Sequence, residues 1–241
     1  MNGLIAAIQF LTVFRLSKQA AFEPEKMLPF FPVVGILIGV FLGCFDRTIA
    51  LVWENHIVSL LDVLFLAWIT GGLHIDGLGD TADGLYGNRP KEKALAIMKD
   101  SRIGAMGMIA IFFGLTVKWA AIDGMESGRF IALLVVPAFA RSSILFGTRF
   151  LAYGRTEGLG KDFFSSAIQW RSFLWVLLPI GLSLFLGGKA LLVICGFFFL
   201  TGAMVLFYKK RINCITGDML GAMNEICEAG LFLVVAMGCA P

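Results

Sequence analysis

Charged residues are scarce in this chain. Asp, Glu, Lys and Arg make up only 15% of its 241 residues, while hydrophobic residues make up 58%. A soluble globular protein of this length would carry more charge and fewer long apolar runs. The net charge of +3 is small and gives no sign of nucleic-acid binding, so we expect no nucleic-acid partner. The five cysteines lack the spacing of a metal site, and we expect them to be reduced and buried.

Apolar runs near membrane-spanning length recur along the whole chain. They predict an all-α, polytopic integral membrane bundle of about six to seven spans, a single membrane-embedded domain over residues 1–241. The candidate spans are residues 32–53, 57–75, 103–122, 130–150, 173–186, 190–208 and 229–240. Residues 1–14 are also apolar but lack the basic start and cleavage site of a signal peptide, so a short N-terminal interfacial helix is expected there.

Basic residues are distributed unevenly between the predicted connections. One alternating set of connections holds fourteen Lys and Arg residues, whereas the other set holds only Arg129 and Lys189. The positive-inside rule places the first set in the cytoplasm. We therefore expect a multi-pass protein of the cell inner membrane, in contact with the lipid bilayer and with its active face toward the cytoplasm.

Three carboxylates follow the second apolar run within the glycine-rich segment 71–84. Asp76, Asp80 and Asp83 have the spacing i, i+4, i+7 and share one face if the segment is helical. Such a stack at a membrane boundary is unfavourable without a positive partner. A hard divalent cation, Mg²⁺ in particular, would be that partner and usually brings a phosphate with it.

A second acidic segment follows the basic run 209–211. Asp218, Glu225 and Glu228 lie close to one helical face, and Thr216 or Asp218 could cap the start of the helix. On its own this segment is typical of a juxtamembrane helix with solvated acids. Its similarity to the first segment favours another interpretation, in which the two acidic helices face each other. Together they would form one site for a diphosphate bound through Mg²⁺.

Several other polar residues are candidates with an ordinary alternative. Lys99 and Arg102 could hold phosphate oxygens or be plain membrane anchors. His74 could act as a base or be a packed, hydrogen-bonded histidine. Glu157 and Lys161 belong to a glycine-rich loop that either closes on a substrate or is a simple turn.

Cations within the apolar runs form a further group. Arg141 lies deep within a predicted span, and an intramembrane cation is a functional candidate by default. Arg149, nearer the end of the same run, is expected to snorkel to the boundary.

The segment 71–84 closely resembles the signature of the cobalamin synthase family, the adenosylcobinamide-GDP ribazoletransferases. Residues 31–35, 98–107, 157–160 and 216–222 also resemble family segments, in the same order and over a similar chain length. One departure is visible, because Asn213 and Cys214 occupy positions where the family usually has glycines. The backbone at that turn is therefore expected to be less free.

The resemblance implies the last step of cobalamin assembly. A hydroxyl of α-ribazole, or of its 5′-phosphate, would attack the β-phosphate of adenosylcobinamide-GDP and release GMP, with Mg²⁺ as cofactor. The role assignment that follows places the metal on Asp76, Asp80, Asp83, Asp218 and Glu228, the catalytic groups at His74, Asp83 and Glu225, and the phosphate and substrate contacts at Lys99, Arg102, Arg141, Glu157, Lys161 and Thr216.

Three alternatives stay open at this point. A membrane prenyltransferase also uses acidic helices and Mg²⁺, although this chain lacks the Asn that usually begins its motif. The segment Asp80-x-x-Asp83-Gly84 also resembles the acidic motif of CDP-alcohol phosphotransferases. An ion-coupled transporter could use the intramembrane Asp46 and Asp62, although the acids gather at one face and no inverted repeat is visible. A homodimer is compatible with so large a substrate, but no pattern indicates one.

Overall fold

The computed structural model describes residues 2–17, 22–157, 159–164 and 168–238, and these residues form a helical bundle. Its α-helices are α1 Asn2–Leu11, α2 Pro24–Met27, α3 Phe31–Ile49, α4 Asn55–Ile69, α5 Leu73–Leu85, α6 Lys91–Ile97, α7 Ala105–Asp123, α8 Arg129–Phe150, α9 Leu177–Ser183, α10 Lys189–Arg211 and α11 Gly217–Ala236. Short 3₁₀ helices are η1 Leu28–Phe30, η2 Tyr86–Asn88, η3 Leu159–Phe164, η4 Trp170–Val176 and η5 Leu184–Leu186.

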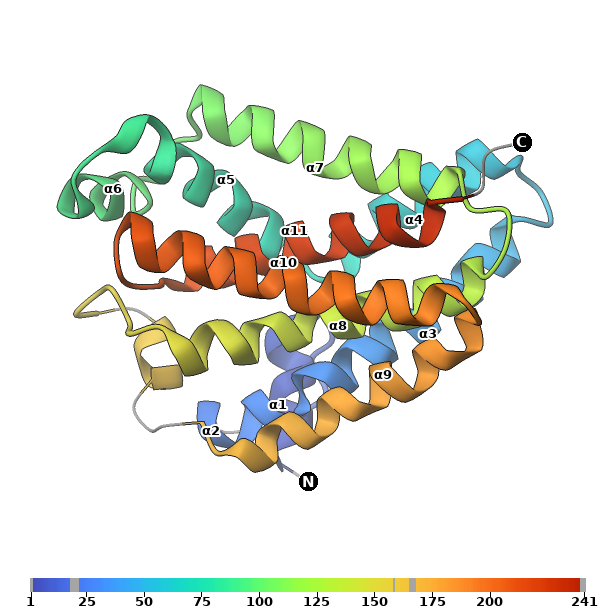
Figure 1. Ribbon diagram of the computed structural model, residues 1–241, viewed down its shortest axis with the longest axis horizontal. Coiled ribbons are helices and arrows are strands. Elements are labelled where there is room, and N and C mark those ends of the chain that lie inside the picture. The colour runs from blue at the N-terminus through green and yellow to red at the C-terminus, as the bar shows by residue number, and fades with distance from the viewer. Residues whose placement is uncertain (1, 18–21, 158, 165–167, 239–241) are drawn as a thin grey trace.

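Five helical segments within the described residues are long and apolar enough to cross a membrane. They are Pro24–Ile49, α7, α8, α10 and α11, and they run along the long axis of the molecule (Figure 1). The α4–α5 pair adds a sixth, bent by 89°, and the shorter apolar segment Trp170–Leu186 lies alongside. The prediction of a polytopic helical membrane bundle is confirmed.

The connections between these helices gather at two opposite ends of the bundle. Residues 86–104, 151–157, 159–164 and 212–216 lie at one end, on the left of Figure 1, and we call this the basic end. The connections 50–54, 124–128 and 187–188 lie at the other end. The alternation of basic and non-basic connections therefore corresponds to two spatially separate ends.

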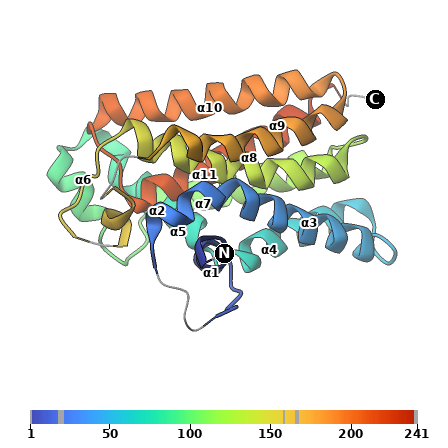
Figure 2. The same cartoon turned by 90° about the horizontal axis from the view of Figure 1, so that it is seen from below.

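Helix α1 crosses the long axis of the bundle. It runs across the bundle in Figure 1 and is seen nearly end-on in Figure 2. Its buried residues Ala6, Ala7 and Leu11 belong to the hydrophobic core, and it packs against α2 and α3. The N-terminal apolar segment is thus a short helix packed on the bundle, and its position at a lipid interface stays a prediction.

The second predicted span, residues 57–75, is wrong at its end. Helix α4 stops at Ile69, and Gly71 and Gly72 adopt positive φ values of 60° and 71°, which residues with a Cβ rarely adopt. The apolar run continues through this break into α5. His74 and Asp76 consequently stand in the first turn of a new helix.

The last predicted span, residues 229–240, begins too late. Helix α11 is one continuous helix that starts at Gly217, and residues 239–240 of the predicted span lie outside the described part of the chain. Glu225 and Glu228 therefore lie about 10 Å and 15 Å along the helix from Asp218, well inside the bundle. The interpretation of these two glutamates as solvated acids is wrong, because both are buried.

The cysteines are free where the structure describes them, but only two are buried. Cys214 and Cys227 are buried, whereas Cys44 and Cys195 are exposed on apolar helices, contrary to the expected burial. Cys239 lies outside the described residues. Exposure on an apolar helix is compatible with contact to lipid, which is as apolar as a protein core.

Candidate active site

The first turns of α5 and α11 cross in close contact. A Cβ on Gly77 would lie 2.6 Å from the backbone oxygen of Asp218, and one on Gly221 would lie 3.3 Å from the backbone of His74. Only glycines allow the helices to approach so closely. The two acidic segments therefore face each other, which brings His74 and Asp76 next to Asp218.

A backbone bridge adds a cation to this crossing. Residues 152–154 run beside Ile215, which donates its N–H to Ala152 O at 2.9 Å and accepts from Gly154 N at 2.8 Å. The bridge holds Arg155 over the start of α11. Its Nη2 donates to Asp218 Oδ2 at 2.6 Å.

The turn before α11 fixes the direction of its first carboxylate. Asn213 adopts a φ of 51°, a left-handed conformation that Asn tolerates better than most residues with a Cβ. Thr216 Oγ1 then accepts from Met219 N at 3.3 Å and caps the helix, as its position in the sequence allows. The left-handed conformation that glycine would provide is thus supplied here by Asn213.

A cavity of about 260 Å³ lies at the crossing, and we call it the α5–α11 cavity. Its polar lining consists of His74, Asp76, Tyr153, Arg155 and Asp218, and its apolar lining includes Phe10, Phe31 and Phe163. Burial raises the pKa of the Tyr153 hydroxyl, so this group stays protonated and able to donate a hydrogen bond at neutral pH.

The acids at the crossing outnumber the cations. The carboxylate of Asp80 interacts electrostatically with those of Asp76 and Asp218 and with the guanidinium of Arg155. We call Asp76, Asp80 and Asp218 the boundary acids. Three carboxylates against one cation leave the site negative, which favours a bound cation.

A preformed metal shell is not found among the described residues, where no three or more His, Cys, Asp and Glu side chains are grouped closely enough to hold an ion. Mg²⁺ does not require one, because it usually binds one or two carboxylates together with water and substrate phosphates. Asp76 and Asp218, on facing helices of one cavity, meet that requirement. The boundary acids therefore fit a magnesium ion that arrives with a diphosphate.

Asp83 occupies a different place from the other acids of its segment. Its Oδ2 accepts from Gly104 N at 2.7 Å and its Oδ1 from Gly107 N at 2.9 Å. Both oxygens thus hold backbone donors at the start of α7, where a carboxylate also complements the helix dipole. In this structure Asp83 joins α5 to α7.

Glu225 and Glu228 form a buried ion cluster with two cations. Lys118 Nζ donates to Glu225 Oε2 and to Glu228 Oε2, both at 2.6 Å, and Arg141 pairs with Glu228 Oε1. All four side chains are at most 6% exposed. Two positive and two negative charges balance. Glu228, expected to hold a metal, and Glu225, expected to be catalytic, both pair with buried cations instead.

This buried cluster was only partly visible in the sequence. Arg141 stands out as an intramembrane cation, and Lys118 lies in another apolar run. Two intramembrane cations call for two acidic partners. That requirement is the signal that could have moved Glu225 and Glu228 into the bundle.

A third ionic group closes the opposite end of the bundle. Arg129 Nε donates to Asp46 Oδ1 at 2.6 Å and its Nη2 to Asp62 Oδ2 at 2.8 Å, which joins α8 to α3 and α4. The two intramembrane aspartates are thus held by one arginine far along the chain. Their position is remote from the basic end.

Four candidate residues are exposed and are not among the described residues that line the α5–α11 cavity. They are Lys99, Arg102, Glu157 and Lys161. Arg102 pairs with Asp100 at 2.6 Å, and its hydrogen bond lowers the pKa of that carboxyl to about 2. The cavity instead contains Arg155 and Tyr153, which the sequence pattern did not single out because the bridge to Ile215 brings them there.

The fold and this cavity define a polytopic helical membrane protein with an acid-rich site between two crossing helices. Residues 3–236 match the family model described as cobalamin-5-phosphate synthase. The chain belongs to this family, and the resemblance of segment 71–84 is confirmed.

Curated relatives align along almost their entire length. Proteins named adenosylcobinamide-GDP ribazoletransferase are 36% identical in Alkaliphilus metalliredigens, over 98% of this chain and 96% of the relative, and 34% identical in Clostridium botulinum strain Okra, over 98% of both. A relative of the same name in Syntrophobacter fumaroxidans is 35% identical over 95% of this chain and 96% of its own length. No solved structure matches the chain.

Proposed function

We propose that this protein joins adenosylcobinamide-GDP to α-ribazole or α-ribazole 5′-phosphate and releases GMP. The relatives carry the name of this transferase, and the α5–α11 cavity is the observation that supports it most directly. The cavity combines carboxylates for a metal, a guanidinium for phosphate and apolar walls. These are the groups that a magnesium-dependent diphosphate reaction requires.

The reaction exchanges one phosphorus–oxygen bond for another. A ribose hydroxyl oxygen attacks the β-phosphorus of the donor, the bond from that phosphorus to the bridging oxygen breaks, and GMP leaves with the bridging oxygen. Arg155 holds a phosphate oxygen, because a guanidinium matches phosphate geometry. Its present partner, Asp218, is then free to turn toward a metal.

The proton of the attacking hydroxyl needs an acceptor in the cavity. His74 lines the cavity, is 3% exposed, and its Nδ1 has no hydrogen-bond partner among the described residues. We assign His74 this role. A bound Mg²⁺, held by Asp76 and Asp218 with Asp80 close by, would neutralise the diphosphate and stabilise the leaving phosphate.

The orientation in the membrane belongs to the same proposal. The protein would lie in the inner membrane of the cell. Its basic end would face the cytoplasm, because basic connections stay on the cytoplasmic side under the positive-inside rule. The α5–α11 cavity borders the loop 151–155 of that end. Water-soluble nucleotides would then enter from the cytoplasm.

The test uses the purified protein in lipid nanodiscs with adenosylcobinamide-GDP, α-ribazole 5′-phosphate and Mg²⁺. We expect GMP to be released in step with cobalamin phosphate, and EDTA to stop the reaction. A parallel reaction with a labelled prenyl diphosphate and an aromatic acceptor tests the competing class. Prenyl transfer without GMP release would replace the proposed function.

A further inference from the structure

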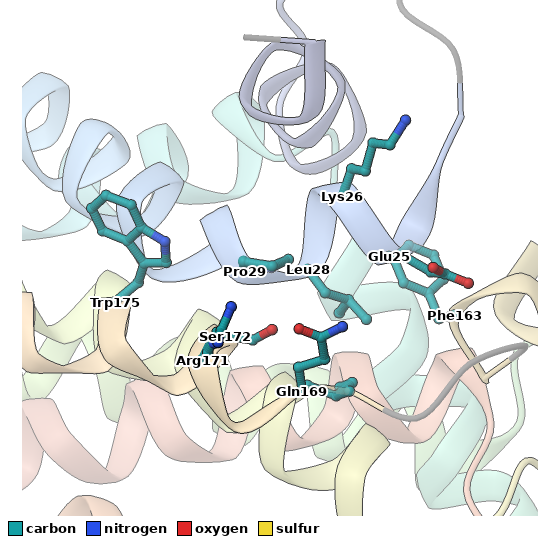
Figure 3. A pocket seen from close by; sticks show the side chains of 10 residues that line it. Glu25, Lys26, Leu28, Pro29, Phe163, Gln169, Arg171, Ser172 and Trp175 are labelled. Atoms are coloured by element: carbon teal, nitrogen blue, oxygen red, sulfur yellow. The ribbon is translucent and has the colours of Figure 1, made fainter.

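A second cavity, of about 450 Å³, lies beside the first at the basic end. Its walls come from α2 and η1 on one side and from η4 on the other (Figure 3). We call it the η4 cavity, defined by Leu28, Pro29, Phe163, Gln169, Arg171 and Trp175. Phe163 also lines the α5–α11 cavity, so the two cavities adjoin at this residue.

The η4 cavity offers a cation without a partner. Arg171 is exposed, and no hydrogen bond or ion pair engages its side chain among the described residues. Gln169 and Ser172 lie beside it in Figure 3 and supply an amide and a hydroxyl. Lys26 points away from the cavity in Figure 3 and pairs with Glu23. Arg171 is therefore the unpaired cation among the described lining residues, and Glu25 is the one carboxylate among them.

The same cavity offers an aromatic surface. Trp175 stands at one end of the cavity in Figure 3 and is 39% exposed. Its indole packs against the ring of Phe30, with 5.7 Å between the ring centroids. An exposed aromatic ring is a stacking platform for a nucleobase, because every base has a π-face that stacks on aromatic side chains.

Cavity size and chemistry together narrow the ligand. Small-molecule sites usually have volumes of about 300–1,000 Å³, with apolar walls and a few placed polar groups. An aromatic ring, an amide and an unpaired guanidinium suit a base, its ribose and a phosphate. We propose that the η4 cavity binds a nucleoside monophosphate group next to the reaction site.

This inference rests on the proposed function, which supplies two groups of this chemistry. One is the acceptor, α-ribazole 5′-phosphate, and the other is the guanosine end of the donor, which leaves as GMP. In either case the base would lie on Trp175 and the phosphate near Arg171. The neighbouring α5–α11 cavity would then hold the reacting diphosphate on the other side of Phe163.

The test compares Arg171→Gln and Trp175→Leu with matched controls away from both cavities. Lys210→Gln removes an exposed positive charge at the basic end, and Trp53→Leu removes an exposed tryptophan at the other end. Equilibrium dialysis of labelled GMP and labelled α-ribazole 5′-phosphate gives the affinity of each variant. We expect both cavity variants to bind one of these nucleotides about tenfold more weakly or worse, and both controls to bind like wild type.

The arms of this experiment separate the two proposals. The nucleotide whose affinity falls identifies the occupant, and KM for the corresponding substrate should rise by a similar factor. Wild-type protein that binds neither nucleotide, or cavity variants that bind both within twofold of wild type, would overturn the inference even if GMP is released. Binding that the variants weaken, in a protein that releases no GMP, would retain the nucleotide site and reject the proposed reaction.

Discussion

Helix α11 carries two groups of acids that differ in how their charge is compensated. At its start, Asp218 joins Asp76 and Asp80 as boundary acids, and Arg155 pairs with Asp218. In its middle, Glu225 and Glu228 face Lys118 and Arg141. The first group has an excess of negative charge, and the second group is neutral.

The difference follows from the cost of isolated charge in an apolar surrounding. A charge inside a membrane bundle needs a partner of opposite sign, because water is not there to solvate it. Partly exposed carboxylates can retain an excess of charge, because water and arriving cations compensate it. One helix thereby combines a charge-balanced middle with an acid-rich end, where we propose that a metal binds.

The largest expected effect is on stability and comes from unbalancing the buried cluster. Lys118→Met leaves Glu225 without its cation and Glu228 with Arg141 only. Removing one partner of a buried ion pair costs about 3–5 kcal/mol, which unfolding in mixed micelles would measure. Lys118→Met combined with Glu225→Gln restores neutrality and should recover most of the lost stability. A double variant as unstable as Lys118→Met would show that charge balance does not stabilise the packing of these helices.

The next effect is on catalysis and comes from the boundary acids. Asp218→Asn should lower the rate of GMP release by about 10²–10³-fold, the loss typical of removing one electrostatic catalytic group, while unfolding stays near wild type. Glu126→Gln, an exposed acid at the opposite end, is the matched control. Near-normal turnover by Asp218→Asn would remove this carboxylate from the reaction.

A smaller effect tests the approach of the two helices. Gly77→Ala places a methyl group 2.6 Å from Asp218 O, so α5 and α11 must move apart. Overpacking of this kind typically costs about 1–3 kcal/mol. We expect reduced stability together with slower GMP release, whereas Gly181→Ala, where a Cβ meets nothing within 4 Å, should change neither. An equal response of both variants would contradict the close crossing.

The smallest effect concerns the turn that presents Asp218. Asn213→Val places a β-branched residue at a φ of 51° and should cost about 1–2 kcal/mol of stability. Asn213→Gly, which restores the residue usual in the family, should stay within about 1 kcal/mol of wild type. Thermal unfolding in detergent would rank the two variants, and the reverse order would argue against the left-handed turn.

The sequence predicted the fold class because composition and apolar run length follow directly from the membrane environment. It missed the break at Gly71 and Gly72 because hydropathy continues through Ile75 and carries no information about φ. The sequence analysis placed Glu225 and Glu228 outside the last span, because a span predicted from hydropathy alone ends where charged residues begin. Their cations, Lys118 and Arg141, come from two other helices.

Part of the candidate site could likewise be predicted from local spacing. Asp76 and Asp80 are grouped by the helical period, and the similarity of the two glycine-rich segments predicted that Asp218 would lie near them. Arg155 could not be found in this way, because a backbone bridge to Ile215 brings it to the site from a loop. Asp83 shares the spacing of its neighbours, but its two oxygens hold the start of α7.

Metal binding should distinguish the boundary acids from the buried cluster on α11. Mn²⁺, which suits the same carboxylate ligands as Mg²⁺, can be titrated into the protein with GDP present while electron paramagnetic resonance reports the free ion. We expect wild type and the neutral double variant Lys118→Met/Glu225→Gln to take up Mn²⁺ alike, and Asp218→Asn to leave it free. Uptake by Asp218→Asn together with loss in the double variant would place the metal in the buried cluster and exclude the boundary acids as its ligands.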